Sequence, residues 1–544
     1  MICLIHGYGL TGSGSNLWTR AIAQAMCQNG ETVHLVCQEN RPEQLDFIAE
    51  AYVYAPDGTP ERLFAREVPY PGRCVVHRPK LDILPTYVRP KSDVTSMASI
   101  LDLSADAIDD YLARNETALQ RVVETHGITA MHVNHVVLMA VAAQRVHART
   151  GVPYAVMPHG SAIEYVVKHD ARMHALASRA LADAALILTL SSEMRERIAD
   201  VFAGTPHLEA KMMPASAGVD TSLFGVIPRD ERPASIARLK ATVAGTPRAK
   251  TPERSEAMLS RLRDDLAFDE LKALVEQAGD YPPRQPDADL EAKLDDVDWE
   301  RERIVAFVGK LISYKGVPAL VAAMPAILAR DPGVRLVVAG RGPLREVLEA
   351  FVWALASGHR TLVRNIARWG SALEGEPPAP FTRVERYFER LEAAGKLDAY
   401  FAAATRHLTP DRILFTGYME HDALCHLFPC CDVAIFPSVV KEAAPLVVPE
   451  AMASGCFPMG TDYAGMATSL DVAAQAVPPQ AAAWMRLRHD PDHTVEDIVA
   501  HVPQALAAGD RYRQALRDVA VAQCDWRSVA RRLSDALTAT DGVS

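Results

Sequence analysis

Hydrophobic residues gather in short unbroken runs that alternate with longer amphipathic stretches along this chain. Short apolar runs bounded by turn residues predict buried strands, and the stretches between them predict helices. Strand and helix alternate repeatedly, which is typical of a doubly wound α/β fold with parallel sheets. The predicted strands are Ile2–His6, Thr32–Cys37, Ile128–Val133, Tyr154–Met157, Ala184–Leu188, Ile304–Gly309, Val334–Val338, Ile413–Tyr418 and Cys431–Phe436.

With 544 residues, the chain is long enough for two core-forming domains plus insertions. We expect an N-terminal domain over residues 1–225 and a C-terminal domain over 301–525. Residues 226–300, which are rich in proline and charge, are predicted to be an insertion or linker. A helical insertion is predicted over 344–409, where apolar residues recur at helical spacing. Residues 38–100 contain many prolines and are expected to be irregular.

A glycine-rich loop follows the first predicted strand. Gly7, Gly9 and Gly12 have the spacing of a dinucleotide-binding turn, and Glu39 lies where an acid that binds a ribose is expected. The helix, however, is predicted to begin only after Gly14, whereas a dinucleotide turn starts its helix inside the glycine motif. The loop alone is therefore equally compatible with a nucleotide cofactor and with a plain tight turn.

The most specific motif runs from Pro437 to Gly465. It places Glu442 in a strand-to-helix loop and Glu450 near the start of the following helix. In open α/β sheets, ligands bind at this carboxyl edge of the strands. Two glutamates at a helix start would indicate little by themselves, because helix N-termini favour acids.

The complete string, with Pro-Ser before Glu442 and Glu-Ala-Met-Ala-Ser-Gly from Glu450 onward, resembles the donor-sugar motif of retaining GT-B glycosyltransferases, glycosyltransferase family 4. The resemblance implies an α/β GT-B fold, in which two Rossmann-like domains face each other across a cleft. It also implies that a C-terminal helix over 526–544 crosses back to the N-terminal, acceptor-side domain. The implied activity is that of a retaining, metal-independent hexosyltransferase, with a nucleotide-diphosphate sugar as co-substrate and no cofactor.

The resemblance also implies roles for individual residues. Glu442 would lie beside the transferred sugar, Glu450 would bind the ribose hydroxyls, and His159 would be the active-site histidine near the sugar. The backbone around Tyr418 and Met419 would contact the base. The implied catalytic residues are His159, Glu442 and Lys315, and the implied donor-binding residues are Gly12, Ser13, Gly14, Lys310, Lys315, Tyr418, Met419, Glu442 and Glu450.

Two lysines, Lys310 and Lys315, flank a predicted strand-to-helix turn, where cations neutralise the charge that develops on a leaving diphosphate. The family usually has arginine at the first position, so Lys310 keeps the charge but loses the bidentate geometry. Residues 443–445 are Ala-Ala-Pro where the family pattern includes glycines, and Pro445 has no N–H group. These departures leave the identity of the donor sugar open.

Charge and hydropathy restrict the partners and the compartment. The net charge of −11 argues against a general nucleic-acid binder, which needs a basic surface. No apolar run reaches the roughly 18 residues of a membrane span, and the chain opens on a strand instead of a signal peptide. Nine scattered cysteines fit reduced thiols. We therefore expect a cytoplasmic protein, with peripheral contact at the inner membrane face as a second expectation.

Residues 61–93 are locally basic in this acidic chain. By the resemblance, they belong to the acceptor-side domain. Such a segment would attract a phosphate- or carboxylate-bearing acceptor, or the anionic headgroups around a lipid acceptor. Arg78, Lys80 and Arg89 are therefore candidate acceptor-binding residues for a sugar, lipid or small-molecule acceptor. The alternative is a solvated loop whose cations pair with acids.

No metal site is predicted from the sequence. The Asp287-x-Asp289 and Asp296-x-Asp298 patterns match a metal-binding signature of GT-A enzymes, but neither follows an apolar strand. His132 and His135 lack a third ligand at a usual spacing. Three other functions stay compatible with the sequence: a GT-B nucleotide-sugar epimerase, an NAD-dependent dehydrogenase using the first glycine loop, and a non-catalytic nucleotide-sugar binder.

Overall fold

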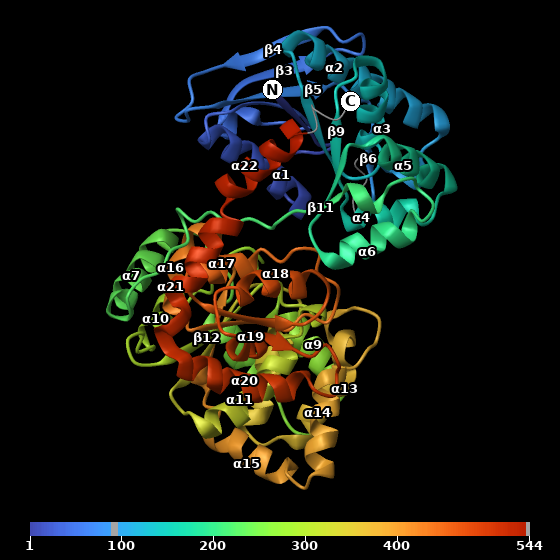
Figure 1. The fold of residues 1–544 in the computed structure, drawn as a ribbon. Helices are drawn as coiled ribbons and strands as arrows, with labels where there is room; N and C mark the ends of the chain where they lie inside the picture. Colours follow the sequence, from blue (N-terminus) through green and yellow to red (C-terminus); the bar gives the residue numbers. More distant parts are fainter. Residues whose placement is uncertain (89–95, 540–544) are drawn as a thin grey trace. The chain divides into compact units, whose positions relative to one another are not determined.

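The computed structural model describes residues 1–88 and 96–539, and the chain divides into two compact units (Figure 1). Unit 1 comprises Met1–Gly218 and the C-terminal segment from Cys524, and unit 2 comprises Val219–Gln523. Each unit is built around its own largely parallel β-sheet with helices packed on it. The predicted α/β class with two domains is therefore confirmed.

Unit 1 contains a nine-stranded sheet with the order β11-β10-β9-β8-β1-β2-β5-β3-β4, in which β4 is antiparallel to β3 and the other neighbours are parallel. A separate parallel pair is formed by β6 and β7. The strands are β1 Ile2–Ile5, β2 Thr32–Val36, β3 Ile48–Tyr54, β4 Pro60–Ala65, β5 Arg73–Pro79, β6 Leu84–Thr86, β7 Met97–Ser99, β8 Ala130–Asn134, β9 Tyr154–Met157, β10 Leu186–Thr189 and β11 Met212–Pro214. The helices are α1 Gly14–Gln28, α2 Ala105–His126, α3 Met139–Thr150, α4 Gly160–Ala162, α5 Ala171–Asp183, α6 Ser192–Val201 and α22 Trp526–Ala539.

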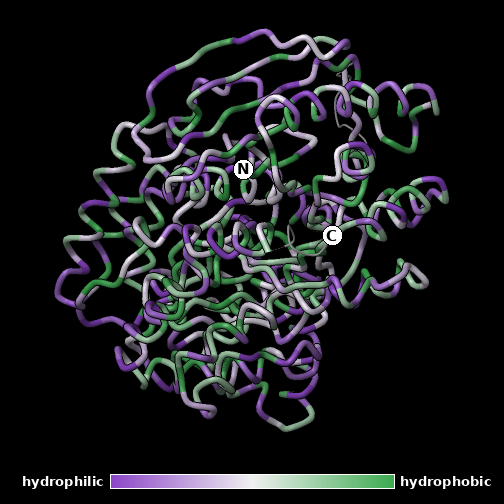
Figure 2. Tube along the Cα trace, turned by 45° about the horizontal axis from the view of Figure 1, so that its top comes forward, coloured by the Kyte–Doolittle hydropathy of each residue, from purple (hydrophilic) through white to green (hydrophobic). Residues whose placement is uncertain are grey.

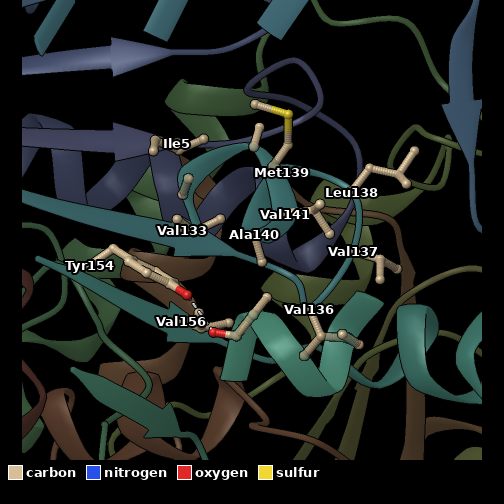
Figure 3. Packing of buried hydrophobic residues seen from close by; sticks show 14 of the residues in the cluster. Ile5, Val133, Val136, Val137, Leu138, Met139, Ala140, Val141, Tyr154 and Val156 are labelled. Carbon is tan, nitrogen blue, oxygen red and sulfur yellow. Dashed lines mark hydrogen bonds between the residues drawn. The ribbon is translucent and has the colours of Figure 1, made fainter. Parts of the chain in front are cut away.

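The core of unit 1 lies on both faces of this sheet, because successive side chains of a strand point to opposite faces. In β1, Ile2 and Leu4 pack in one buried cluster with residues of α1 and α22. Cys3 and Ile5 pack in the other cluster, with residues of α2, α3 and α5. Figure 3 shows part of this second cluster around Ile5 and Tyr154. A strand that is apolar at every position is therefore explained by helices on both faces.

The segment expected to be irregular, residues 38–100, is structured in its described part, and that prediction is wrong. It supplies β3, β4 and β5, which extend the sheet beyond β2. The prolines mark the ends of these strands: Pro60 begins β4 and Pro79 ends β5. The run Ile48–Tyr54 has the β-branched and aromatic residues of a strand, and this signal outweighs the prolines around it.

Unit 2 contains a six-stranded, fully parallel sheet with the order β14-β13-β12-β15-β16-β17. The strands are β12 Arg303–Val308, β13 Val334–Ala339, β14 Ile413–Gly417, β15 Val433–Phe436, β16 Phe457–Thr461 and β17 Arg486–Leu487. The helices are α7 Arg232–Val243, α8 Pro252–Leu259, α9 Phe268–Ala278, α10 Leu290–Asp295, α11 Val317–Arg330, α12 Arg345–Ala356, α13 Arg360–Trp369, α14 Thr382–Ala393, α15 Leu397–His407, α16 His421–Leu427, α17 Val447–Ala453, α18 Ala464–Ala474, α19 Pro479–Met485, α20 Thr494–Ala508 and α21 Arg513–Val519. Figure 2 shows hydrophobic and hydrophilic residues alternating along helical turns of the chain, as expected for helices with one face on a core.

The charged stretch 226–300 forms helices α7 to α10 within unit 2. Some of its charged residues are buried in ion pairs with other parts of unit 2: the fully buried Arg232 lies 2.7 Å from Asp432. Asp287, from the first Asp-x-Asp pattern, is buried and lies 2.7 Å from Arg345 and 2.8 Å from Lys293. These cations hold the pKa of Asp287 below its usual value despite its burial. Asp287 therefore belongs to an internal ion-pair network.

No helix within residues 1–88 and 96–539 combines the length and the apolar character needed to cross a membrane.

Candidate functional site

The carboxyl edge of the unit 2 sheet gathers the predicted donor-binding residues of the second domain. β12, β13, β14 and β15 are parallel neighbours, so the loops after them emerge at one edge. Lys310 and Lys315 follow β12, Tyr418 and Met419 follow β14, and Glu442 follows β15.

Glu442 is held by two side chains. The Lys315 ammonium forms an ion pair with Glu442 Oε1. The Ser438 hydroxyl donates to the same oxygen at 2.6 Å. Lys315 and Glu442 come from different strand-to-helix loops, and the structure brings them together as a site requires. Lys310, by contrast, is exposed.

The backbone of the Glu442 loop is fixed by close packing. Gly465, at the start of α18, donates its N–H to Glu442 O at 2.8 Å. A Cβ at Gly465 would lie 2.2 Å from Ala443 O, so only glycine allows this approach. Arg383, a buried residue of α14, donates to Pro437 O at 2.6 Å and to Ser438 O at 3.2 Å. The helical insertion therefore supports the loop that carries Glu442.

Glu450 lies in the first turn of α17 and is nearly fully buried. Its Oε1 lies 3.1 Å from Nε2 of His421, at the start of α16. The hydrogen bond to Glu450 raises the pKa of His421 above its ordinary value. A buried carboxylate that accepts one hydrogen bond from a histidine can accept further hydrogen bonds from ligand hydroxyls.

The backbone around Tyr418 and Met419, which is expected to contact the base, already makes one hydrogen bond within the protein. The Tyr418 N–H donates to Gln285 O at 3.0 Å, so a base contact at Tyr418 would have to use its carbonyl. Met419 is buried. The guanidinium of Arg341, in the loop after β13, lies 5.7 Å from the centre of the Tyr418 ring.

In unit 1, β9, β8 and β1 are adjacent and parallel, so the loops after them also share one carboxyl edge. The glycine loop after β1 leads into α1, which begins at Gly14, slightly earlier than predicted. Ser13 is the N-cap and accepts the Asn16 N–H. Gly12 adopts a positive φ of 101°. Gly12, Ser13 and Gly14 therefore lie at the N-terminus of α1, where backbone N–H groups attract anions.

His159 follows β9 and joins a hydrogen-bond chain at this edge. Its Nε2 lies 2.8 Å from Asn134 Oδ1, and Asn134 Nδ2 donates to Thr19 Oγ1 at 3.0 Å. The His135 ring lies 4.6 Å from the His159 ring. Burial lowers the pKa of His159 to about 3 and the pKa of the neighbouring His6 to about 4. Both imidazoles are therefore neutral near pH 7.

Glu39, the acid that a dinucleotide would require, is already engaged. Its Oε2 accepts the N–H of Leu10 at 2.8 Å, and its Oε1 accepts the N–H of Arg41 at 2.9 Å. The carboxylate therefore braces the glycine loop from the end of β2.

The three candidate acceptor-binding residues differ in their surroundings. Arg78 donates to Glu39 O at 3.2 Å and to Asn40 Oδ1 at 3.1 Å. Lys80 is exposed at the end of β5. Arg89 lies outside the described residues. Arg78 thus has a structural role in addition to any contact with an acceptor.

Solved glycosyltransferase structures share this fold over nearly their whole length. Sucrose-phosphate synthase from Thermosynechococcus elongatus is 15% identical with a TM-score of 0.51, and the match covers 100% of this chain and 99% of that chain. The catalytic domain of starch synthase IV from Arabidopsis thaliana, bound to ADP and acarbose, is 13% identical with a TM-score of 0.51, and the match covers 99% of each chain. At these identities the likeness concerns the fold.

Family sequence profiles match both units. The profile of the glycosyl transferase 4-like domain matches residues 13–212. Two profiles of the glycosyl transferases group 1 match residues 291–363 and 382–487. The chain is a GT4-like protein of the GT-B fold.

One curated relative of this GT4-like protein is the uncharacterized glycosyltransferase MJ1607 of Methanocaldococcus jannaschii, which is 27% identical over 154 residues. The aligned part is 28% of this chain and 26% of that relative. The match therefore spans about a quarter of the curated relative's length.

Several residues of the site carry no assignment from the sequence. Asn134 follows a predicted strand directly, so its place at the sheet edge could have been inferred. Ser438 is part of the Pro-Ser turn in the motif. His421 and Arg383, however, come from segments far from their partners in sequence, and no local pattern indicates these contacts.

Proposed function

We propose that this GT4-like protein is a retaining glycosyltransferase that transfers a sugar from a nucleoside diphosphate sugar to an acceptor. The observation that carries the proposal is Glu442, held between Lys315 and Ser438 at the carboxyl edge of the unit 2 sheet. A carboxylate and a lysine in strand-to-helix loops at the carboxyl edge of a parallel sheet fit the binding of a sugar diphosphate. That the similar starch synthase IV was solved with ADP supports a nucleotide ligand.

In this proposal Glu442 accepts hydrogen bonds from hydroxyls of the transferred sugar, and Glu450 accepts those of the ribose. Lys315 precedes α11, so its ammonium and the N-terminus of that helix together stabilise the negative charge on the leaving diphosphate. The sugar–phosphate bond breaks, and the acceptor oxygen bonds to the anomeric carbon on the same face. The acceptor proton passes to the departing phosphate.

His159 has a hydrogen-bonding part in this proposal. Because its pKa is low, the neutral imidazole orients the sugar and is not a proton donor near pH 7. The basic residues of β5 and beyond favour an anionic acceptor on unit 1, with Lys80 as the exposed contact.

Binding assays test the donor. Isothermal titration with UDP, GDP, ADP and NAD is expected to give binding to one nucleoside diphosphate and none to NAD, because Glu39 is engaged by two backbone N–H groups. Lys315→Met should weaken diphosphate binding, and Lys272→Met on α9 is the matched control. Tight NAD binding, or equal affinities in the two variants, would contradict the proposal.

Retention is tested separately. Proton NMR of the product of an α-linked donor should show an α-anomeric coupling, and a β-anomer would exclude retention while leaving the transferase proposal intact.

A further inference from the structure

Three histidines from separate elements meet on one face of the unit 1 sheet. His34 lies in β2, His77 in β5 and His126 at the end of α2. One ring nitrogen from each lies within 4.8 Å of the other two. Within residues 1–88 and 96–539, no other group of three or more metal-ligating side chains has ligand atoms this close.

The packing explains why the three rings converge. β2 and β5 are parallel neighbours, and His34 is paired with Val75, two residues before His77, so both imidazoles point to the same face. α2 packs on β5 and ends at His126. The His126 ring lies 4.3 Å from the His34 ring and 5.3 Å from the His77 ring.

The hydrogen bonds around the rings orient two of them toward a common point. His34 Nδ1 lies 2.9 Å from His77 Nε2, so these two nitrogens share one proton. The outer nitrogen of His77, Nδ1, lies 2.9 Å from the Tyr54 hydroxyl. The outer nitrogen of His34, Nε2, lies 3.1 Å from Met1 Sδ. Metal-binding histidines typically have their second nitrogen hydrogen-bonded in this way.

We propose that His34, His77 and His126 form a binding site for a divalent transition metal of the zinc class. Three imidazoles without a carboxylate favour zinc, nickel or copper over magnesium and calcium. In a tetrahedral zinc site with zinc–nitrogen bonds of about 2.1 Å, neighbouring nitrogens lie about 3.4 Å apart. The His34 and His77 nitrogens, now 2.9 Å apart, would therefore separate slightly to admit the metal, and a fourth position would stay open for water.

Coordination needs no net loss of a proton. The proton now shared between His34 Nδ1 and His77 Nε2 moves to an outer nitrogen, His34 Nε2 or His77 Nδ1. Both inner nitrogens then present lone pairs to the metal, and the outer N–H faces Met1 Sδ or the Tyr54 oxygen.

The site would tie the end of α2 to two strands of the sheet. Met1, which precedes β1, contacts His34, and α2 ends at His126 just before β8, so these two histidines lie on the side of the amino ends of β1 and β8. His77 faces His34 from β5. The glycine loop and His159 follow the carboxyl ends of β1 and β9. A metal here would therefore stabilise unit 1 and take no part in sugar transfer.

Zinc binding to tag-free, chelator-treated protein tests the proposal, with a chromophoric chelator as competitor. Wild type should bind one tight equivalent, with a higher melting temperature in zinc. Cobalt in place of zinc should give the visible absorption of a four-coordinate site. His126→Ala should lose the tight equivalent, while His169→Ala, which removes an exposed histidine outside the cluster, should keep it.

Tyr54→Phe provides a second variant that keeps all three histidines. Its zinc affinity should fall by about 10- to 100-fold, because the His77 ring loses its orienting partner. The proposal is overturned if wild type binds no tight equivalent, if His126→Ala and His169→Ala bind zinc equally, or if Tyr54→Phe binds as wild type does.

Discussion

His159 donates its Nε2–H to the side-chain oxygen of Asn134 at 2.8 Å, and Asn134 is fixed in turn by its bond to Thr19. The direction of the first bond follows from the second, because the Asn134 amide nitrogen is used by Thr19. The remaining nitrogen of His159, Nδ1, therefore carries the lone pair. A ring held in this way can accept a hydrogen bond from a sugar hydroxyl but not donate one.

His159→Ala should therefore lower kcat more than nucleotide affinity. The expected loss in kcat is about 10- to 100-fold, equivalent to about 1.4–2.8 kcal/mol, because one oriented hydrogen bond to the sugar disappears. Steady-state kinetics and titration with the nucleoside diphosphate measure the two effects. Asn134→Ala should show a smaller loss of the same kind. Equal loss of nucleotide binding would point to a structural histidine.

The buried histidines of unit 1 should make the fold sensitive to acid. Burial lowers the pKa of His132 and of His159 to about 3, and that of His6 to about 4, below the ordinary 6.5. The unfolded chain therefore takes up protons first. Their contribution to stability is complete above pH 6.5 and is lost as the pH falls from 6.5 toward 3.

His132→Phe tests this point. His132 packs against Trp18, with ring centres 5.3 Å apart, and its two ring nitrogens have no hydrogen-bond partner in the described part of the chain. The variant should lose less melting temperature between about pH 7.5 and about pH 5 than wild type does. Exposed His169→Phe is the control and should match wild type. If the melting temperature of His132→Phe falls as much as that of wild type, protonation of His132 does not cause the acid sensitivity.

Glu450→Gln should remove the preference for ribose over 2′-deoxyribose in the bound nucleotide. The carboxylate is nearly fully buried, and a lost hydroxyl contact of this kind costs about 1–3 kcal/mol. Titration with the ribo- and deoxyribonucleoside diphosphates measures the preference, with Glu389→Gln on α14 as the control. A variant that discriminates as wild type does would exclude the ribose assignment.

The same variant makes a second prediction. Glu450 is the main cause of the raised pKa of His421, so Glu450→Gln should lower that pKa. NMR titration of the His421 ring measures it. An unchanged pKa would mean that the hydrogen bond between the two side chains does not form in solution.

The sequence predicted most of the framework, because its strands are apolar on both faces and therefore read as unbroken runs. The string around Glu442 and Glu450 located the donor loop, since a strand end and a helix start are local features. The prediction for residues 38–100 is wrong because prolines indicate irregular structure when read alone, whereas Pro60 begins β4 and Pro79 ends β5. Partners such as Arg383, His421 and the His34 cluster depend on packing between distant segments, which no local pattern encodes.

Gly465→Ala should weaken donor binding through the Glu442 loop. The new Cβ would lie 2.2 Å from Ala443 O and 2.4 Å from Glu442 O, so the loop must move. Isothermal titration should show lower affinity for the nucleoside diphosphate sugar, and a smaller loss for the nucleoside diphosphate alone. Gly333→Ala is the control, because its Cβ would meet only Asp331, at an ordinary 3.4 Å. Unchanged sugar-donor affinity in Gly465→Ala would contradict the role of this loop.

Lys80→Glu should impair an anionic acceptor without affecting the donor. Lys80 is exposed at the end of β5, whereas Arg78 also supports the backbone at Glu39. A substitution at Lys80 therefore tests attraction of the acceptor without disturbing the fold. Reversing its charge should raise KM for a phosphorylated acceptor but not for its neutral counterpart, and added salt should diminish the difference. Lys168→Glu, on another part of unit 1, is the charge-matched control. If both variants show the same acceptor kinetics, the basic segment is a solvated surface and the acceptor is recognised elsewhere.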